Sequence, residues 1–511
     1  MATPTATAPR RKVMFLSNSD RGEIGVTIAT AQAILETTSD VEVHIATYAG
    51  VEELISKALP VVYHRIERSA SCLEMLTLLA SRNIKTKPGY LPLTFLNKPS
   101  FGNTLQAIRD CMPIFVPMSG PAMEEIVLDV LRIINGVKPD FLVVNSVMTV
   151  GLTAAMHSKI SMVILSPNSI KEFVASLQPQ AAVLWKFPAI FSGYSYPIPF
   201  FQKPVNIIYT LWAAAVFKTD PHRKAVEQHL ESSSGIKMYT AADLIQNRIP
   251  GMQILVASMP ELDYPLVIHD HIHPLGPIVG RWEPIRETDP ELAAWLARAP
   301  TLYINLGSLL LTDEDQALEM AAAVKAVLRR AGEAGNEDMA GLQVIWKLRK
   351  YGDYDIKDPK CAMYDILGAE MEADRVRIEK WFIPEPLSIL QSGHIVCSVH
   401  HGGANSFNEA VISGLPQVVL PPWTDCFDYA QRAELHGIGR WGSRNSNPQW
   451  AAQELAASMS WCLFGETAAG ARQKAKALAD LVKERGSGAV KAAEYIIGQI
   501  NTVATEGQAQ A

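Results

Sequence analysis

The sequence predicts an α/β protein with two doubly wound, parallel-sheet domains that face each other across a cleft. The chain has 511 residues, which is too long for one hydrophobic core. Its composition, with 48% apolar and 19% charged residues, is typical of a globular protein. Short apolar runs alternate with longer helical patterns in two successive series, and this alternation predicts two parallel sheets.

The first series predicts an N-terminal domain over residues 1–280. Residues 26–35 are rich in alanine, which favours a crossover helix between the first two strands. The apolar runs are expected to be buried parallel strands, and they cover residues 13–16, 41–46, 141–145, 162–165 and 253–258.

The second series predicts a C-terminal domain over residues 281–485. It follows a segment at 281–290 that carries two prolines and mixed charge, which indicates an interdomain linker. Residues 486–511 contain a helix with one apolar face and then a polar tail. The strands of this second series are expected at residues 301–306, 343–347, 395–399 and 417–420.

Charge and cysteine content exclude several classes of protein. The net charge of −6 gives no reason to expect a nucleic-acid partner, which would favour a basic surface. The six cysteines are scattered without a CxxC pair, which favours free thiols in a reducing compartment. The polar residues 1–12 precede an apolar run that is too short for a signal peptide. We therefore expect a cytoplasmic protein.

Residues 181–217 interrupt the alternating pattern because they are rich in Trp, Phe, Tyr and Pro. One interpretation is a packed loop and short helix inside the first domain. The other is an apolar wall for a lipophilic ligand that also rests on a membrane surface. The sequence leaves both open, so peripheral membrane contact through 181–217 remains an alternative.

The segment with the clearest chemistry follows the strand at 395–399. It reads His400-His401-Gly402-Gly403-Ala404-Asn405-Ser406, and a helix that contains Glu409 comes next. Glycines let the backbone approach a ligand, and the free N–H groups of a helix start bind phosphate without lysine or metal. His401, Asn405 and Ser406 add side-chain donors, and Glu409 can accept from ribose hydroxyls. These residues together predict a nucleotide diphosphate site.

A longer span of the sequence resembles the donor-binding signature of the family 1 UDP-glycosyltransferases, most closely their fungal branch. The strand end at Gly307-Ser308 is also similar to the family's diphosphate contact. The span that carries the resemblance reads Trp381…Leu390…His401-Gly402-Gly403-Ala404-Asn405-Ser406-x-x-Glu409…Gly414-Leu415-Pro416…Pro422-Trp423-Thr424-Asp425.

The resemblance implies a GT-B fold of two Rossmann-like domains, whose last helix crosses back to the first domain. It also implies an inverting transfer from a UDP-sugar, which is a co-substrate, with no cofactor and no metal. The acceptor would be a small lipophilic secondary metabolite or sterol-like molecule. By position, Trp381 would stack on uracil, Glu409 would hold ribose, and Asp425 would bind sugar hydroxyls. The remaining residues of the implied donor site are Ser308, His401, Gly403, Ala404, Asn405, Ser406 and Cys426.

The sequence departs from the family pattern at the catalytic base. Glu23 stands where the family has a histidine, and Asn145 stands where it has the orienting aspartate. Glu23 can serve as the base if desolvation raises its pKa, and Asp20 is the reserve candidate. Alternatively, Glu23 is a helix-start carboxylate that the dipole favours and that has no chemical role.

The missing His–Asp pair also supports a rival function, a non-catalytic nucleotide-sugar-binding partner or regulator. A GT-B epimerase is a third interpretation, and it needs no apolar acceptor wall. Cys426 and Glu385 replace common glutamines of the family, so the identity of the sugar stays open. The segment His269-Asp270-His271-Ile272-His273 is expected to be a loop near the cleft rather than a metal site. No dinucleotide fingerprint or P-loop is present.

Overall fold

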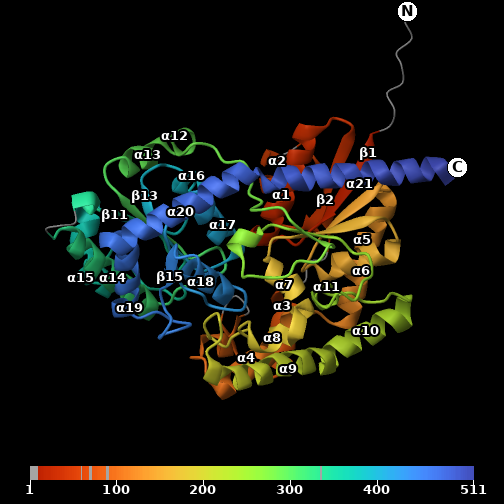
Figure 1. Ribbon diagram of the computed structural model, residues 1–511, viewed down its shortest axis with the longest axis horizontal. Helices are drawn as coiled ribbons and strands as arrows, with labels where there is room; N and C mark the ends of the chain where they lie inside the picture. The colour runs from red at the N-terminus through yellow and green to blue at the C-terminus, as the bar shows by residue number, and fades with distance from the viewer. Residues whose placement is uncertain (1–9, 59, 68–71, 88–90, 334–336, 511) are drawn as a thin grey trace, which may run out of the picture.

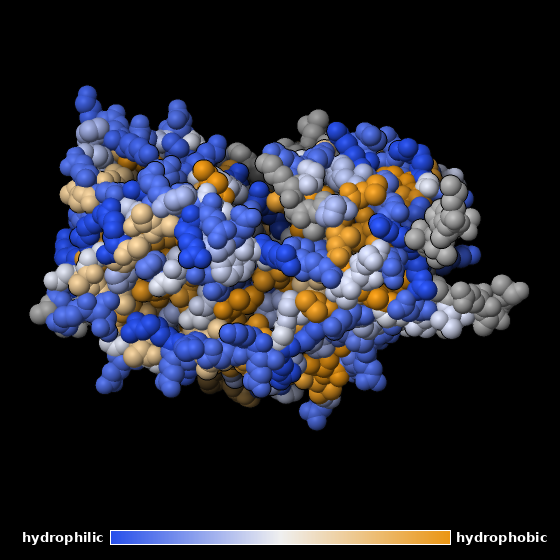
Figure 2. Space-filling view, turned by 90° about the horizontal axis from the view of Figure 1, so that it is seen from above, coloured by the Kyte–Doolittle hydropathy of each residue, from blue (hydrophilic) through white to orange (hydrophobic). Residues whose placement is uncertain are grey.

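The computed structural model describes residues 10–510 apart from 59, 68–71, 88–90 and 334–336, so most of the polar segment at 1–12 lies outside the described residues. Two parallel-sheet domains lie next to each other (Figure 1). Seen from above, they form two lobes with a notch between them, and hydrophilic side chains cover most of this face (Figure 2). No helix in the described part of the chain is both long and apolar enough to cross a membrane.

The first sheet has seven parallel strands in the order β3-β2-β1-β6-β7-β8-β9. Strand β1 pairs with β2 on one side and with β6 on the other, so the order reverses there. This reversal opens a crevice at the carboxyl ends of the strands, where ligands bind in such folds. The strands are β1 (Arg11–Leu16), β2 (Val41–Tyr48), β3 (Val62–Ile66), β6 (Phe141–Asn145), β7 (Met162–Ser166), β8 (Ile254–Val256) and β9 (Ile272–Pro274). A separate two-stranded sheet consists of β4 (Thr86–Lys87) and β5 (Leu91–Pro92).

The second sheet has six parallel strands in the order β12-β11-β10-β13-β14-β15. Its central strands are buried along their whole length, because helices cover both faces. The strands are β10 (Thr301–Asn305), β11 (Gln343–Lys347), β12 (Val376–Glu379), β13 (Ile395–His400), β14 (Gln417–Val419) and β15 (Gly439–Trp441).

Helices cover the faces of both sheets and fill the connections between strands. In the first domain they are α1 (Arg21–Thr37), α2 (Glu52–Ala58), α3 (Cys72–Ser81), α4 (Phe101–Cys111), α5 (Gly120–Val137), α6 (Thr149–Ser158), α7 (Ile170–Val174), α8 (Ala182–Trp185), α9 (Lys203–Thr219), α10 (Pro221–Ser234) and α11 (Ala241–Ile245). The later ones are α12 (Ile285–Thr288), α13 (Pro290–Leu296), α14 (Glu314–Ala331), α15 (Ala362–Glu372), α16 (Pro386–Leu390), α17 (Ala404–Ile412), α18 (Cys426–Leu435), α19 (Ala452–Leu463), α20 (Gly465–Arg485) and α21 (Gly488–Gln510).

Helix α21 lies along α1 of the first domain (Figure 1). Its buried face is built from Ala492, Ala493, Ile496 and Ile500, which join the same core cluster as the first strand. Alanines at this contact let the two helix backbones approach closely. The C-terminal helix therefore packs against α1 and joins the core of the first domain.

The structure adds detail to two segments of the predicted organisation. In the segment at 269–273, His269 and His271 lie in a turn, whereas His273 lies on the edge strand β9, which pairs with β8. His273 bonds to Gln253 at 2.7 Å, and its ring lies 4.7 Å from that of Tyr495. The segment at 281–290, the expected interdomain linker, contains α12 and the first residue of α13.

Candidate active site

All of the residues predicted to bind or react line one cleft between the two domains, whose volume is about 1490 Å³. The cleft lies at the carboxyl ends of both sheets, as the crevice rule for doubly wound sheets requires. The predicted residues found there are Asp20, Glu23, Ser308, Trp381, His401, Gly403, Ala404, Asn405, Ser406, Glu409, Asp425 and Cys426. Their individual roles stay predictions.

The start of α17 forms the anion-binding part of the cleft. Gly403 precedes the helix, and no side chain caps the helix start. The first N–H groups of a helix have no partner within it, so those of Ala404, Asn405 and Ser406 are available to a ligand in the cleft. A diphosphate placed there also meets the positive end of the helix dipole.

Glycines at two positions make room for the imidazole of His401. A Cβ atom on residue 307 would lie 2.6 Å from His401 Cε1, and one on residue 403 would lie 2.5 Å from Nε2. Burial, the neighbouring His400 and Lys347 lower the pKa of His401 to about 3, so its ring is neutral. Its Nδ1 is buried without a hydrogen-bond partner in the described structure.

His400 supports this turn from behind. The N–H of Gly402 donates to His400 Nδ1 at 3.0 Å, so the proton of the ring is on Nε2, which lies 2.8 Å from Gln417 Oε1. Gly402 has a φ of +84°, and a Cβ there would lie 2.9 Å from the carbonyl oxygen of Cys426. The turn is therefore fixed on one side by β14 and on the other by α18.

Two cations flank Trp381, the predicted uracil contact. Trp381 is 45% exposed, Lys347 Nζ lies 4.2 Å from the centre of its ring, and the guanidinium of Arg21 lies 5.2 Å away. Lys347 is only 7% exposed. Burial and the positive charges of Arg349 and Arg21 lower its pKa to about 8. Lys347 was not among the predicted residues, although a single charged residue at the carboxyl end of an apolar strand indicates a position in the cleft.

Glu409 lies on α17, one turn beyond the anion site. Burial raises its pKa to about 8, the carboxylate of Glu385 adds to the shift, and Lys347 opposes it. Glu385 also pairs at 3.5 Å with Arg21 of the first domain. The predicted ribose contact is thus placed within a chain of charges that runs from one domain to the other.

Asp425 directly precedes α18 and lines the cleft. Its Oδ1 accepts a hydrogen bond from Thr424 Oγ1 at 2.9 Å, and burial raises its pKa. Cys426 is 1% exposed and burial raises the pKa of its thiol, so it is a neutral part of the wall. Glu172 of α7 also lines the cleft, and burial and the nearby Asp425 raise its pKa to about 8. Glu172 was not among the predicted residues.

Glu23 lies in the first turn of α1, on the wall opposite α17. Burial, with the neighbouring charge of Asp20, raises its pKa to about 8. Burial also raises the pKa of Asp20. Asn18 Nδ2 donates to Glu23 Oε2 at 2.7 Å, so Asn18 orients the carboxyl. Asn145 instead accepts from the N–H of Val147 at 3.0 Å and holds its own turn.

The two walls of the cleft touch at the anion site. Asn405 Nδ2 donates to the carbonyl oxygen of Gly22 at 3.3 Å. A Cβ atom on Gly25 would lie 3.6 Å from the same nitrogen. The start of α1 is therefore next to the start of α17, and Glu23 is on the same helical turn as this contact.

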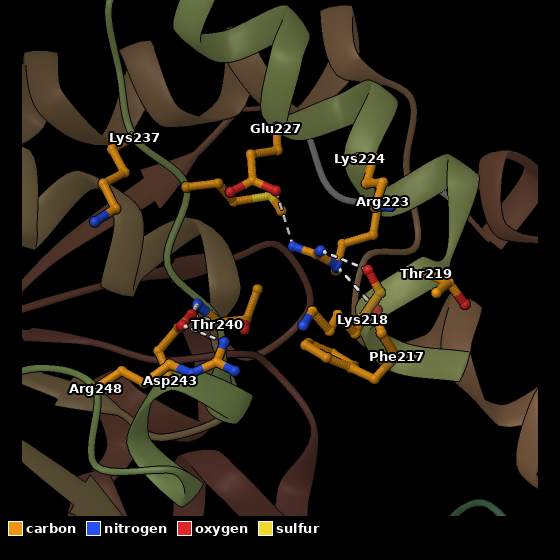
Figure 3. A pocket seen from close by; sticks show the side chains of 11 residues that line it. Phe217, Lys218, Thr219, Arg223, Lys224, Glu227, Lys237, Thr240, Asp243 and Arg248 are labelled. Atoms are coloured by element: carbon orange, nitrogen blue, oxygen red, sulfur yellow. Dashed lines mark hydrogen bonds and ion pairs between the residues drawn. The ribbon is translucent and has the colours of Figure 1, made fainter. Parts of the chain in front are cut away.

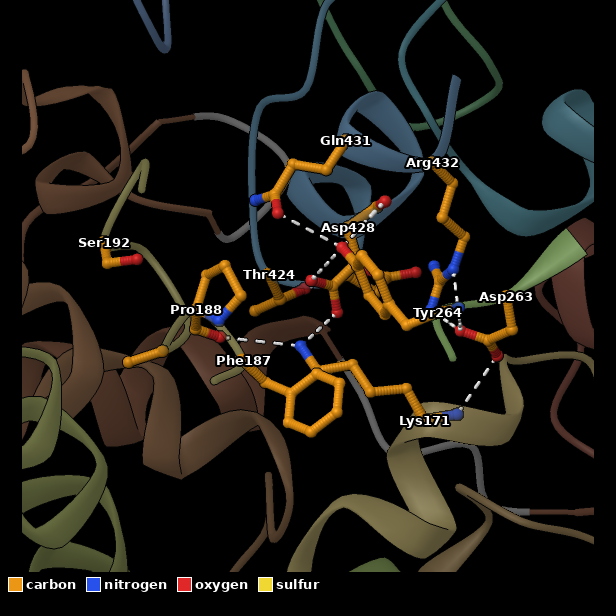
Figure 4. A network of polar contacts seen from close by, with 12 residues as sticks. Lys171, Phe187, Pro188, Ser192, Asp263, Tyr264, Thr424, Asp428, Gln431 and Arg432 are labelled. Carbon is orange, nitrogen blue, oxygen red and sulfur yellow. Dashed lines mark hydrogen bonds and ion pairs between the residues drawn. The ribbon is translucent and has the colours of Figure 1, made fainter. Parts of the chain in front are cut away.

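A buried polar network joins the domains beside α18 (Figure 4). Lys171 Nζ lies 2.6 Å from Asp428 Oδ2, and Tyr264 Oη lies 3.2 Å from Asp428 Oδ1. Arg432 donates twice to Asp263 Oδ1, at 3.0 and 2.8 Å, and both side chains are at most 1% exposed. The network ties α18, which follows Asp425 directly, to the first domain.

The first-domain side of the cleft is largely apolar. Side chains from α4 to α9 supply this wall, which includes part of the aromatic segment at 181–217. The apolar residues that line it include Phe95, Ile114, Phe115, Met118, Val150, Phe173, Val183, Phe187, Ile190 and Ala213. The aromatic segment therefore packs in the domain and part of it lines the cleft, and its contact with a lipophilic ligand or a membrane stays a prediction.

Comparison with known proteins agrees with this geometry. No family model matches the chain. Glycosyltransferase sdnJ of Sordaria araneosa is 30% identical over 454 residues, which cover 86% of this chain and 84% of sdnJ. UDP-glycosyltransferase 74C1 of Arabidopsis thaliana is 30% identical over 142 residues, 27% of this chain and 26% of that protein. The structure of Phytolacca americana UGT2 with UDP-2fluoro-glucose and pterostilbene covers 96% of this chain and 100% of that chain, with a TM-score of 0.61 at 14% identity.

The similarity to sdnJ extends over both domains, and the similarity to the solved structure extends over the whole fold. The predicted GT-B architecture of two Rossmann-like domains is confirmed. The chain belongs to the family 1 UDP-glycosyltransferases and is a UDP-dependent glycosyltransferase.

Proposed function

We propose that this protein transfers a sugar from a UDP-sugar to a hydroxyl of a small lipophilic acceptor, with inversion and without a metal ion. The observation that carries the proposal is the placement of Glu23 opposite the start of α17 in one cleft. Such a transfer needs two parts, a carboxyl that takes a proton and a set of hydrogen-bond donors that hold a diphosphate.

The proposed step moves one proton and one glycosyl group. The carboxylate of Glu23 takes the proton of the acceptor hydroxyl, and the acceptor oxygen bonds to the anomeric carbon of the sugar. The bond from that carbon to the diphosphate oxygen breaks on the opposite face, so the configuration inverts and UDP leaves. Fixed N–H groups at α17, His401 and the Lys347 ammonium stabilise the charge on the leaving UDP in place of a metal.

The acceptor proposal rests on the apolar wall between α4 and α9. An apolar wall selects ligands that gain from leaving water, and the few polar groups in the cleft then fix their orientation. The natural acceptor on this view is a lipophilic alcohol or phenol with the size of a secondary metabolite or sterol.

A turnover screen by mass spectrometry tests the proposal. UDP-glucose, UDP-N-acetylglucosamine, UDP-galactose and UDP-xylose are each combined with terpenoid alcohols, sterols and phenols. We expect a glycosylated product with a β-linkage from an α-configured donor, and the same yield with EDTA present. UDP binding without any product would favour the non-catalytic partner, and an altered sugar nucleotide would favour an epimerase.

Removal of the ribose and phosphate contacts is expected to weaken UDP binding. His401→Ala should raise the Kd of UDP by about 10- to 100-fold, since a hydrogen bond to the charged diphosphate contributes about 1.5–3 kcal/mol. Glu409→Ala should raise it by about tenfold, since the ribose hydroxyls then lose their partner. Isothermal titration calorimetry measures the effect, and Glu466→Ala on the exposed start of α20 is the matched control. UDP affinities equal to that of the parent in both variants would show that the donor site is elsewhere.

Replacement of Lys347 separates its charge from its packing. Lys347→Met keeps a long apolar stem against Trp381 and removes the ammonium, so we expect a Kd of UDP raised by about tenfold and a weaker dependence on salt. The Kd of uridine, which carries no phosphate, should change less than the Kd of UDP. An equal change for both ligands would mean that Lys347 supports the ring of Trp381 only.

A further inference from the structure

Helix α9 is a surface helix whose outward face is apolar. Its only charged residues are Lys203 and Lys218, at its two ends. A surface helix of a globular protein normally turns its polar face outward, so this arrangement is reversed. The exposed positions between the lysines are Pro204, Ile208, Leu211, Trp212, Ala214 and Ala215.

The apolar surface continues onto the neighbouring segments. Phe200 and Phe201, in the turn before α9, are 76% and 89% exposed. Phe101 of α4 is 53% exposed, and its ring lies 5.9 Å from that of Tyr209 on α9. We call this surface the α9 face, which consists of Phe101, Phe200, Phe201, Ile208, Leu211 and Trp212. Such a surface marks an interaction site.

A basic pocket lies at the C-terminal end of α9, where α10 begins (Figure 3). Its volume is about 390 Å³. Glu227 and Asp243 are its carboxylates, and they pair with Arg223 and Arg248. For the three lysines of the pocket no ion pair is found within the described residues. The cationic residues that line it are Lys218, Arg223, Lys224, Lys237 and Arg248.

We propose that the α9 face binds the surface of an anionic lipid bilayer, with the basic pocket on lipid phosphates. An apolar helix face flanked by lysines is the pattern of a helix that lies in the headgroup plane. The excess of cations over carboxylates in the pocket complements anionic headgroups, which attract each nearby lysine or arginine. Phe200 and Phe201 are the most exposed side chains of the α9 face and are the ones expected to insert between headgroups.

The position of α9 gives this docking a consequence for the proposed acceptor. Thr210 and Ala213, on the inner side of the helix, line the cleft, whereas Leu211 and Trp212 are exposed on the outer side. One helix therefore separates the membrane from the acceptor wall. An acceptor dissolved in the bilayer therefore has a short path into the cleft. This consequence rests on the proposed lipophilic acceptor, whereas the docking of the α9 face on a membrane does not depend on it.

Vesicle flotation of the full chain tests the docking without donor or acceptor. The parent protein should float with phosphatidylcholine vesicles that contain phosphatidylserine, less with phosphatidylcholine alone, and less at high salt. Leu211→Ser combined with Phe201→Ser should reduce the bound fraction at least fivefold. Lys218→Glu combined with Lys224→Glu should remove the preference for phosphatidylserine.

Matched control variants show whether a loss of flotation is specific to the α9 face or follows from any exposed substitution. Leu128→Ser on α5 and Lys360→Glu before α15 change an exposed leucine and an exposed lysine elsewhere, so both should float like the parent. Absence of flotation of the parent with either vesicle would overturn the proposal. So would equal flotation of the face variants and the controls. Self-association of the parent that Leu211→Ser abolishes, without vesicle binding, would assign the face to a second copy of the chain.

Discussion

Replacement of Glu23 by glutamine is expected to lower the kcat of sugar transfer to an aliphatic alcohol by about 10²- to 10⁴-fold, the usual contribution of a general base. Glutamine keeps the size of the side chain and a hydrogen bond with Asn18, so the cleft wall stays in place. The Kd of UDP should not change, because the donor contacts lie on the opposite wall. Initial rates at saturating donor and acceptor measure the effect.

The pH profile distinguishes a base from a merely structural carboxyl. Burial and Asp20 raise the pKa of Glu23 to about 8, so the ionised form that accepts a proton is the minority below that pH. We expect kcat/KM of the parent to rise about tenfold per pH unit below pH 8, and to fall above it because the Lys347 ammonium then loses its proton. Glu23→Gln should lose the rise below pH 8. A parent profile that is flat between pH 6 and 9 would contradict the assignment.

Glu172→Gln is the matched control, because burial raises the pKa of this cleft carboxyl to about 8 as well. Asn168 Nδ2 donates to Glu172 Oε2 at 2.8 Å, as Asn18 Nδ2 donates to Glu23 Oε2 at 2.7 Å. The charge that adds to the pKa shift of Glu172 is that of Asp425, whereas for Glu23 it is that of Asp20. We expect Glu172→Gln to raise the KM of the donor and to keep the pH profile. If Glu172→Gln loses the pH dependence and Glu23→Gln keeps it, Glu172 is the base. An acidic phenol as acceptor should rescue Glu23→Gln in part, since it needs less help to lose its proton.

The central strands could be predicted from the sequence because helices cover both of their faces. Strands such as β6 and β10 are buried throughout and contain almost only apolar residues. The edge strands β3, β9, β12 and β15 escaped prediction because each has an unpaired side and is only partly buried. Strand β3, for example, reads Val-Tyr-His-Arg-Ile and keeps only its last residue buried. Periodicity cannot distinguish such a segment from a polar loop.

The donor half of the site could be predicted because its residues are nearly contiguous. One strand, turn and helix carry His401 to Glu409, so local geometry alone brings them together. Lys347 and Glu172 lie far away in the chain and reach the cleft only through the strand order and the approach of the two domains. The spacing of residues along the sequence does not show how the two domains approach each other. The same limit hid the pairing of Arg21 with Glu385.

Loss of the buried ion pair between Asp263 and Arg432 is the other change with a large expected effect. Arg432→Leu should lower the free energy of unfolding by about 3–5 kcal/mol, because it leaves the carboxylate of Asp263 buried without its countercharge. Asp263 would keep only its bonds from the N–H groups of Lys171 and Tyr264. Urea denaturation, followed by tryptophan fluorescence, measures the difference.

The exposed pair of Arg485 and Glu261 provides a matched control. Glu261 is two residues before Asp263, and the pair also links the C-terminal part of the chain to this segment, but its side chains are 50% and 31% exposed. Arg485→Leu should cost less than about 1 kcal/mol, since water screens and solvates exposed charges. Equal losses in Arg432→Leu and Arg485→Leu would show that burial of the first pair has no special effect.

The double variant Asp263→Leu with Arg432→Leu separates stability from activity. Replacement of both charges by apolar side chains removes the unpaired carboxylate, so most of the lost stability should return. The two hydrogen bonds from Arg432 to Asp263, which help to hold α18 against the first domain, would still be missing, and Asp425 directly precedes α18. We therefore expect the KM of the donor to stay raised in the double variant. Recovery of both stability and KM would mean that packing alone fixes α18, and persistent loss of both would mean that the leucines do not fit the interface.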